Sequence, residues 1–282
     1  MNEKGICSWR KWVHSSPVAA FFLLTFLISW SIWGAAWFLL PGASWELRIA
    51  VHTVGLFGPT AAALIMSGRL YGRRGVGDLV IRIARWRVGV GWYLFALFST
   101  LGIGLGAIGV HALVGGATPP TNLHVVFAQV ISAGLPEEYG WRGFALPHLL
   151  KRRSALGSSL IIAILWVLWH IPISPILNDT SFLGLFLLEV IPLTILFSWL
   201  YINSHGSILL VVLFHLASNA VVEVLNIPGS LSLWAIYVGM NWLLVVSIAA
   251  RYGVARLSRY GGADIDRDLG TSRALARERV GA

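Results

Sequence analysis

The sequence predicts an all-α membrane protein, a polytopic bundle of about eight transmembrane helices. Of its 282 residues, 57% are hydrophobic and only 12% are charged, whereas soluble domains carry about 25% charged residues. The apolar residues form continuous runs of helical length rather than alternating patterns, which disfavours a β-barrel. The 14 tryptophans suit membrane interfaces and helix packing. We therefore expect most of the chain to lie in the lipid bilayer.

Eight apolar runs approach the length of about 20 residues that a helix needs to cross the hydrocarbon core. They cover residues 17–40, 49–67, 92–114, 123–150, 155–171, 181–202, 207–224 and 231–250. The fifth run is short and the fourth is long, so their ends are the least well defined. A Gly58-Pro59 pair in the second run predicts a kink.

The distribution of Lys and Arg predicts the orientation, because cytoplasmic loops carry an excess of these residues. Nineteen of the 21 lie in 1–16, 68–91, 151–154 and the segment from Arg251 onward. With eight spans, all four segments face the cytoplasm. The predicted organisation is a cytoplasmic N-terminus (1–16), a transmembrane domain (17–250) and a charged cytoplasmic tail (251–282), in the cell membrane. Topology thus explains the net charge of +9, and no nucleic-acid partner is expected.

One stretch inside the fourth span carries three ionisable residues, Glu137, Glu138 and Arg142. Such groups cost a few kcal/mol each at this depth, so they indicate a functional site. Glu138 and Arg142 are four residues apart and should form an ion pair on one helix face. Glu137 shares its face with Trp141 and has no counter-ion on its own helix, which suits a general base. A structural salt-bridge network is the alternative interpretation.

Two later spans supply possible partners. His170 ends the fifth span, with Trp166 one turn earlier on the same face. His215 and Asn219 share a face of the seventh span. A single intramembrane histidine is more often a packing residue. Two histidines, an Asn and a Glu pair from three helices instead favour one shared polar site.

These residues resemble the motifs of the CPBP family of intramembrane proteases (CAAX protease and bacteriocin-processing, also called Abi). Glu137-Glu138-Tyr139-Gly140-Trp141-Arg142 matches the EExxxR motif, Trp166 to His170 matches FxxxH with Trp in place of Phe, and His215 to Asn219 matches HxxxN. The three motifs occur in the family's order within residues 120–225. The resemblance implies an eight-helix fold and endopeptidase activity within the membrane. Eukaryotic members remove the last three residues of prenylated CAAX proteins.

By resemblance, Glu137 activates water with the assistance of His170, while His215 and Asn219 stabilise the oxyanion. Glu138 and Arg142 orient the site, and Trp141 and Trp166 support it. Two histidines and one glutamate are also a catalytic zinc ligand set, so Glu137, His170 and His215 are the metal ligands in an alternative reading. The family has been described both as metallo- and as glutamate-type. The absence of an HExxH pair favours a site without metal.

The sequence therefore predicts an intramembrane endopeptidase that cuts a peptide or a membrane-associated protein, with a CAAX-like, lipidated or leader-type segment as the candidate cleavage region. A second interpretation is a non-catalytic scaffold or bacteriocin self-immunity protein that grips a partner peptide in the same cavity. A third is a transporter, since chains of Glu, His and Arg also relay protons. No pair of matching broken helices supports the transporter.

Overall fold

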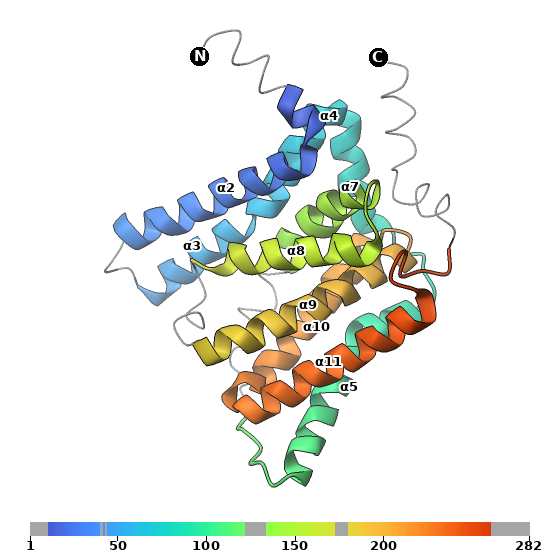
Figure 1. Cartoon of the computed structure of the whole chain (residues 1–282). Helices are drawn as coiled ribbons and strands as arrows, with labels where there is room; N and C mark the ends of the chain where they lie inside the picture. Colours follow the sequence, from blue (N-terminus) through green and yellow to red (C-terminus); the bar gives the residue numbers. More distant parts are fainter. Residues whose placement is uncertain (1–10, 40–41, 43, 122–133, 173–179, 261–282) are drawn as a thin grey trace.

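The structure is a computed structural model that describes residues 11–39, 42, 44–121, 134–172 and 180–260. The described residues form helices and connecting turns, with no strand among them (Figure 1). The α-helices are α2 (Pro17–Leu39), α3 (Trp45–Leu56), α4 (Gly58–Val80), α5 (Val90–Leu113), α7 (Leu146–Leu150), α8 (Ala155–His170), α9 (Thr180–Asn203), α10 (Ile208–Val224) and α11 (Leu231–Tyr252). Two 3₁₀ turns, η1 (Ile81–Ala84) and η5 (Ile227–Gly229), and a π-helix, η3 (Tyr139–Ala145), complete the order.

The prediction of an all-α membrane bundle is confirmed. Within the described residues, 6 helical segments are long and apolar enough to cross a membrane, and α8 is a shorter apolar helix of 16 residues. The fourth predicted span is helical over residues 134–150, while its residues 123–133 lie outside the described part. The structure thus accounts for the predicted segments as helices but does not establish eight complete spans.

The second predicted span differs in its limits. It is interrupted at Phe57, between α3 and α4, where Pro59 lies in the first turn of the new helix. This break confirms the kink expected at Gly58-Pro59. The predicted end at residue 67 is wrong, because α4 continues through the basic segment to Val80. Gly72 interrupts its helical geometry with a φ of +66°, a conformation that glycine adopts without steric cost.

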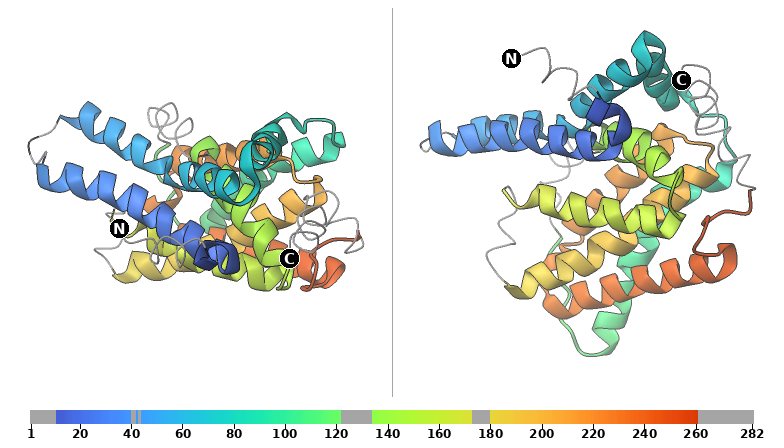
Figure 2. Two further views of the ribbon diagram at one scale, coloured as in Figure 1. Left: turned by 90° about the horizontal axis from the view of Figure 1, so that it is seen from above. Right: turned by 45° about the horizontal axis from the view of Figure 1, so that its top comes forward.

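Contacts between neighbouring helices build the bundle. Helix α2 packs on α3 and α4, whereas α8 packs on α9, and α11 packs on α5 and α9. Figure 1 shows the α2–α3 pair on one side, α8 and α9 in the middle, and α11 and α5 on the other side. The views of Figure 2 show the pair formed by α2 and α3 extending beyond the rest of the bundle. The chain after α11 returns to the start of α8, where Ala155 N donates to Ala255 O at 2.7 Å.

The π-helix η3 lies against α4 and also touches α9 and α10. Gly140 makes the contact with α4 possible, because a Cβ at this position would lie 2.5 to 2.7 Å from atoms of Pro59. The hydroxyl of Thr60 donates to the carbonyl of Pro136, and Arg82 Nη1 donates to Gly143 O at 2.8 Å. Short π-helical segments are rare and occur frequently at functional sites. Here the π-helix begins directly after the two glutamates of the first motif.

Candidate active site

Glu137 is held by two indole groups. Its side chain is only 1% exposed, and its Oε2 accepts hydrogen bonds from Trp141 Nε1 at 3.1 Å and from Trp166 Nε1 at 2.7 Å. The first bond is the one expected from the four-residue spacing, and the second joins the motif helix to α8. Both donors bind the same oxygen, so Oε1 has no hydrogen-bond partner among the described residues.

Glu138 has a different environment, made of cationic and imidazole groups. Its Oε1 accepts from Arg142 Nη1 at 3.0 Å, which confirms the predicted ion pair within the motif. The same oxygen lies 2.7 Å from Nδ1 of His215 on α10. Glu138 and Arg142 are completely buried, and His215 is 3% exposed. A carboxylate fixed by two partners from two helices suits a role in holding the site together.

Aromatic rings complete the surroundings of Arg142. Its guanidinium carbon lies 4.1 Å from the ring centre of Phe197 and 5.0 Å from that of Trp166. A planar guanidinium stacks on aromatic faces and is less strongly hydrated than an ammonium group, so Arg tolerates this dry position better than Lys. Within the described residues its Nε and Nη2 have no hydrogen-bond partner. The rings therefore supply part of the stabilisation of the buried charge.

The contacts of His170 indicate which of its nitrogens carries hydrogen. Its Nδ1 lies 2.7 Å from the carbonyl oxygen of Trp166, one turn earlier on α8. A carbonyl can only accept a hydrogen bond, so we assign the hydrogen to Nδ1. In the neutral ring this leaves Nε2 as the acceptor. His170 is thus arranged to receive a proton or to orient a water molecule through Nε2.

Trp166 is the common neighbour of these groups. Its indole N–H binds Glu137, its carbonyl binds His170, and its ring lies 5.6 Å from the His215 ring and beneath Arg142. It connects residues from the motif helix, α8 and α10. The sequence analysis gave this position a supporting role. The structure adds a hydrogen-bond donor to Glu137, which the Phe usual in the motif could not supply.

Asn219 lies one turn beyond His215 on α10 and is half-buried. Its side-chain amide has no hydrogen-bond partner among the described residues. Among the candidate catalytic residues, Asn219 is thus the one whose side chain forms no hydrogen bond within the described residues. Its amide N–H groups can therefore donate to a substrate.

The candidate zinc ligands make separate contacts within the protein. No group of three His, Cys, Asp or Glu side chains within the described residues could hold a metal ion. The two nitrogens Nδ1 of His170 and His215 face a carbonyl and a carboxylate, and Oε2 of Glu137 faces two indoles. These contacts engage one ring nitrogen of each histidine and one oxygen of Glu137.

One feature of the site was not predicted from the sequence. Phe197 on α9 is completely buried, lies beneath Arg142 and has its ring 5.2 Å from that of His215. It belongs to an apolar span with several aromatic residues, and no spacing distinguishes it. Glu189, on the same helix, is absent from the site: its Oε2 accepts from Trp234 Nε1 at 2.6 Å, in a separate apolar cluster.

Comparison with known proteins gives a consistent assignment. A family model described as type II CAAX prenyl endopeptidase Rce1-like matches residues 119–221. A protein of Methanococcus maripaludis named CAAX prenyl protease 2 is 25% identical over 249 residues, which cover 81% of this chain and 91% of that protein. Both matches support the resemblance to the CAAX protease (CPBP) family. The protein is a multi-pass membrane protease, and the region that the family model matches contains all three motifs.

Proposed function

We propose that this protease hydrolyses a peptide bond of a membrane-associated substrate with water activated by Glu137 and His170. The observation that carries the proposal is the double indole clamp on Glu137 Oε2, at 3.1 and 2.7 Å. The clamp fixes the carboxylate and leaves its second oxygen without a partner among the described residues. Neutral N–H donors orient the group without pairing it with a cation, so the carboxylate keeps its ability to accept a proton.

In the proposed reaction, the water oxygen attacks the carbonyl carbon of the scissile bond while its proton passes to Glu137. His170 orients the water through Nε2, because its Nδ1 is bound to the Trp166 carbonyl. The tetrahedral intermediate then collapses, the C–N bond breaks, and Glu137 returns the proton to the leaving amine. Each step moves one proton between the water, the carboxylate and the amine, as general acid–base catalysis requires.

His215 and Asn219 are the proposed donors to the oxyanion that forms on the attacked carbonyl. Because Nδ1 of His215 faces Glu138 at 2.7 Å, only Nε2 is left to meet the substrate. Nε2 donates to the oxyanion only when both ring nitrogens carry hydrogen, with Nδ1–H bound to Glu138. Removing one donor of this kind from an oxyanion site costs about 100- to 1000-fold in turnover.

The substrate class follows from the family and from the curated relative, which is named a CAAX prenyl protease. We propose a peptide segment at or near the membrane surface, with a CAAX-type C-terminus as the first candidate to test. The predicted orientation, with both termini in the cytoplasm, places such a substrate on the cytoplasmic side. The site is proposed to work without a metal, because the sequence has no HExxH pair and no group of three His, Cys, Asp or Glu side chains within the described residues could hold a metal ion.

The decisive experiment compares Glu137→Gln with Glu189→Gln. Both glutamates lie in spanning segments and accept an indole N–H, but only Glu137 belongs to the motif. The purified variants are reconstituted in liposomes, and cleavage of CAAX peptides with and without an isoprenoid group is followed by mass spectrometry. We expect Glu137→Gln to lower kcat/KM by about 100-fold or more, and Glu189→Gln to remain close to wild type.

Full cleavage by a folded Glu137→Gln variant would exclude Glu137 as the base. If the wild-type protein binds the peptide tightly but cleaves it neither with nor without the isoprenoid group, the scaffold interpretation is favoured instead. For the metal, cleavage is measured after exhaustive chelation, with the zinc content of the purified protein determined in parallel. Activity that disappears on chelation and returns with zinc would refute the metal-free mechanism.

A further inference from the structure

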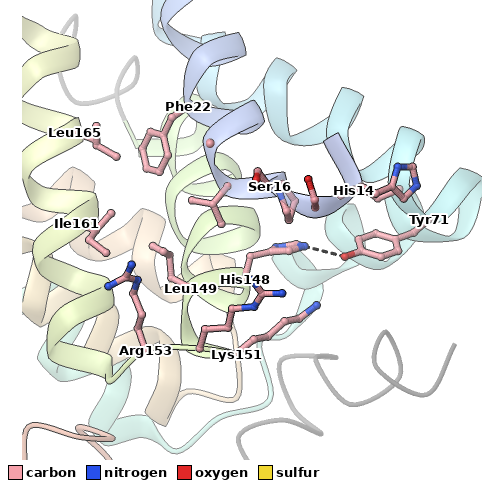
Figure 3. Close-up of a pocket in the computed structure, with 16 residues that line it drawn as sticks. His14, Ser16, Phe22, Tyr71, His148, Leu149, Lys151, Arg153, Ile161 and Leu165 are labelled. Atoms are coloured by element: carbon pink, nitrogen blue, oxygen red, sulfur yellow. Dashed lines mark hydrogen bonds between the residues drawn. The ribbon is translucent and has the colours of Figure 1, made fainter. Parts of the chain in front are cut away.

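A cavity separate from the candidate active site opens between the start of α2, α4, the α7–α8 turn and one face of α8. Its volume is about 920 Å³, within the range of about 300 to 1000 Å³ that is typical of ligand pockets. The proposed catalytic residues Glu137, His170, His215 and Asn219 are not among the residues that line it. The cavity has an apolar part and a basic part, which Figure 3 shows at opposite ends.

The basic part is formed by the turn between α7 and α8. Lys151, Arg152 and Arg153 follow one another along the wall, and both arginines are exposed. Neither arginine side chain is engaged in an ion pair or hydrogen bond among the described residues. No Asp or Glu is present among the described residues that line the cavity. This end of the cavity is therefore complementary to an anion.

The start of α2 reinforces this complementarity. Residues 16–19, which include the first turn of the helix, line the same cavity. The first N–H groups of a helix have no intrahelical acceptor, and they give this end a partial positive charge. The helix end and the three basic side chains come from different parts of the chain and favour the same charge sign.

His148 lines the cavity but is not expected to bind the anion. Its Nδ1 lies 2.7 Å from the carbonyl oxygen of Phe144, and its Nε2 lies 2.8 Å from the hydroxyl of Tyr71 (Figure 3). Both ring nitrogens are thus engaged within the protein, and the ring stacks on Phe144 at 4.2 Å. The anion is expected to meet the lysine and the two arginines instead.

The apolar part runs between α2 and α8. Phe22 on α2 faces Ile161 and Leu165 on α8, with Leu149 nearer the basic turn (Figure 3). A free inorganic anion would not bury this apolar surface, whereas a hydrocarbon chain can cover it. The cavity thus has a basic end followed by an apolar channel between two membrane helices. This arrangement is complementary to a phospholipid, whose headgroup lies at the interface and whose chains lie deeper.

We propose that this cavity binds one anionic phospholipid, with its phosphate at Lys151, Arg152 and Arg153 and the first part of an acyl chain against Phe22, Ile161 and Leu165. The shared chemistry is a phosphate group, which arginine recognises through its planar fork of donors. The anionic lipid is the source favoured by the apolar half of the cavity. The basic turn is predicted to face the cytoplasm, where anionic lipids attract basic residues.

The test uses the purified full-length protein in a neutral detergent, stripped of lipid. Phosphatidylglycerol or phosphatidylcholine is titrated in, and bound lipid is counted by native mass spectrometry. We expect one phosphatidylglycerol per chain, bound at least about tenfold more tightly than phosphatidylcholine. Arg152→Ala with Arg153→Ala should weaken this binding by about tenfold or more, because two positive charges near the phosphate are lost.

The matched control is Arg73→Ala with Arg74→Ala, an adjacent exposed arginine pair on α4 that does not line the cavity. It should bind phosphatidylglycerol like wild type, and the double Arg→Lys variant at 152 and 153 should retain most of the affinity. Ile161→Trp narrows the apolar part and should lower the affinity while the basic turn is unchanged. Melting curves of each variant without lipid verify that the proteins are folded.

Three outcomes would overturn the proposal. The first is equal affinity for the two lipids, and the second is an equal loss of binding in the control pair. The third is displacement of the lipid by inorganic phosphate or glycerophosphoglycerol at comparable concentrations, which would reveal an anion site with no role for the acyl chain. Because the readout is lipid binding, failure here leaves the proposed proteolysis untouched, and loss of cleavage in Glu137→Gln leaves the lipid site untouched.

Discussion

Trp166→Phe removes one hydrogen-bond donor from the proposed base while keeping an aromatic ring in place. In the structure, Trp166 Nε1 lies 2.7 Å from Glu137 Oε2, and Trp141 Nε1 donates to the same oxygen at 3.1 Å. A hydrogen bond to a charged group contributes about 1.5 to 3 kcal/mol. Since about 1.4 kcal/mol corresponds to a factor of ten, loss of the shorter bond should reduce the population of correctly oriented carboxylate about 10- to 100-fold.

We therefore expect Trp166→Phe to lower kcat by about 10- to 100-fold, with little change in KM, because the indole contacts the base rather than the substrate. The assay is steady-state cleavage of a CAAX-type peptide in liposomes. The matched control is Trp234→Phe, which removes the indole N–H bound to Glu189 at 2.6 Å outside the site. That variant loses the same kind of bond and should keep its activity.

A double-mutant cycle makes this reasoning refutable. If the indole acts through the carboxylate, adding Trp166→Phe to Glu137→Gln should cause much less than the sum of the two single losses. Independent, additive losses would show that Trp166 acts on the site by another route. An unchanged kcat in Trp166→Phe, or the same reduction in Trp234→Phe, would show that the N–H donor has no role in catalysis.

Three further predictions concern stability and topology. Arg142→Met should lower the free energy of unfolding by about 3 to 5 kcal/mol, because it removes the guanidinium that is paired with the buried Glu138 carboxylate. Arg142→Lys should recover only part of this loss, since an ammonium group cannot stack on Phe197 as the guanidinium does at 4.1 Å. Denaturation in detergent measures the stability of both variants, and a fully stable Arg142→Met would refute the role of the ion pair. Gly140→Ala should lower the free energy of unfolding by about 1 to 3 kcal/mol, because its Cβ would lie 2.5 to 2.7 Å from atoms of Pro59. In the control variant Gly239→Ala, the new Cβ has nothing within 4 Å, so stability should be unchanged or slightly higher. Equal melting temperatures of the two variants would contradict the close contact. In a Cys7→Ser background, Arg73→Cys should react with an impermeant thiol reagent only from the cytoplasmic side and Thr118→Cys only from the opposite side, and the reverse pattern would invert the topology.

The sequence predicted the contacts that depend on spacing within one helix. The pairs Glu138–Arg142 and Glu137–Trp141 lie four residues apart, and each forms a hydrogen bond in the structure. This holds although residues 139–145 form a π-helix, which the sequence did not reveal. The change in helix type leaves the side chains of each pair within reach of each other. Local spacing was therefore sufficient information for these two contacts.

Contacts between helices needed the three-dimensional structure. The bonds from Trp166 to Glu137 and from His215 to Glu138 join residues 29 and 77 positions apart, so their geometry depends on how α8 and α10 pack against the motif helix. The sequence suggested a common site from residue chemistry but could not say which glutamate each partner binds. Phe197 had no distinguishing signal at all, because its function depends on the position of Arg142 above its ring.

Helix packing gives the two adjacent glutamates different hydrogen-bond donors. In hydrocarbon, a carboxylate must be satisfied by protein donors, since bulk water is absent. Glu138 receives a guanidinium and an imidazole, which both bind its Oε1. Glu137 receives only neutral indole donors, which hold one oxygen and add no positive charge. This difference in donor charge is the physical reason for assigning the base to Glu137 and the organising role to Glu138, although the two residues are identical in type and adjacent in sequence.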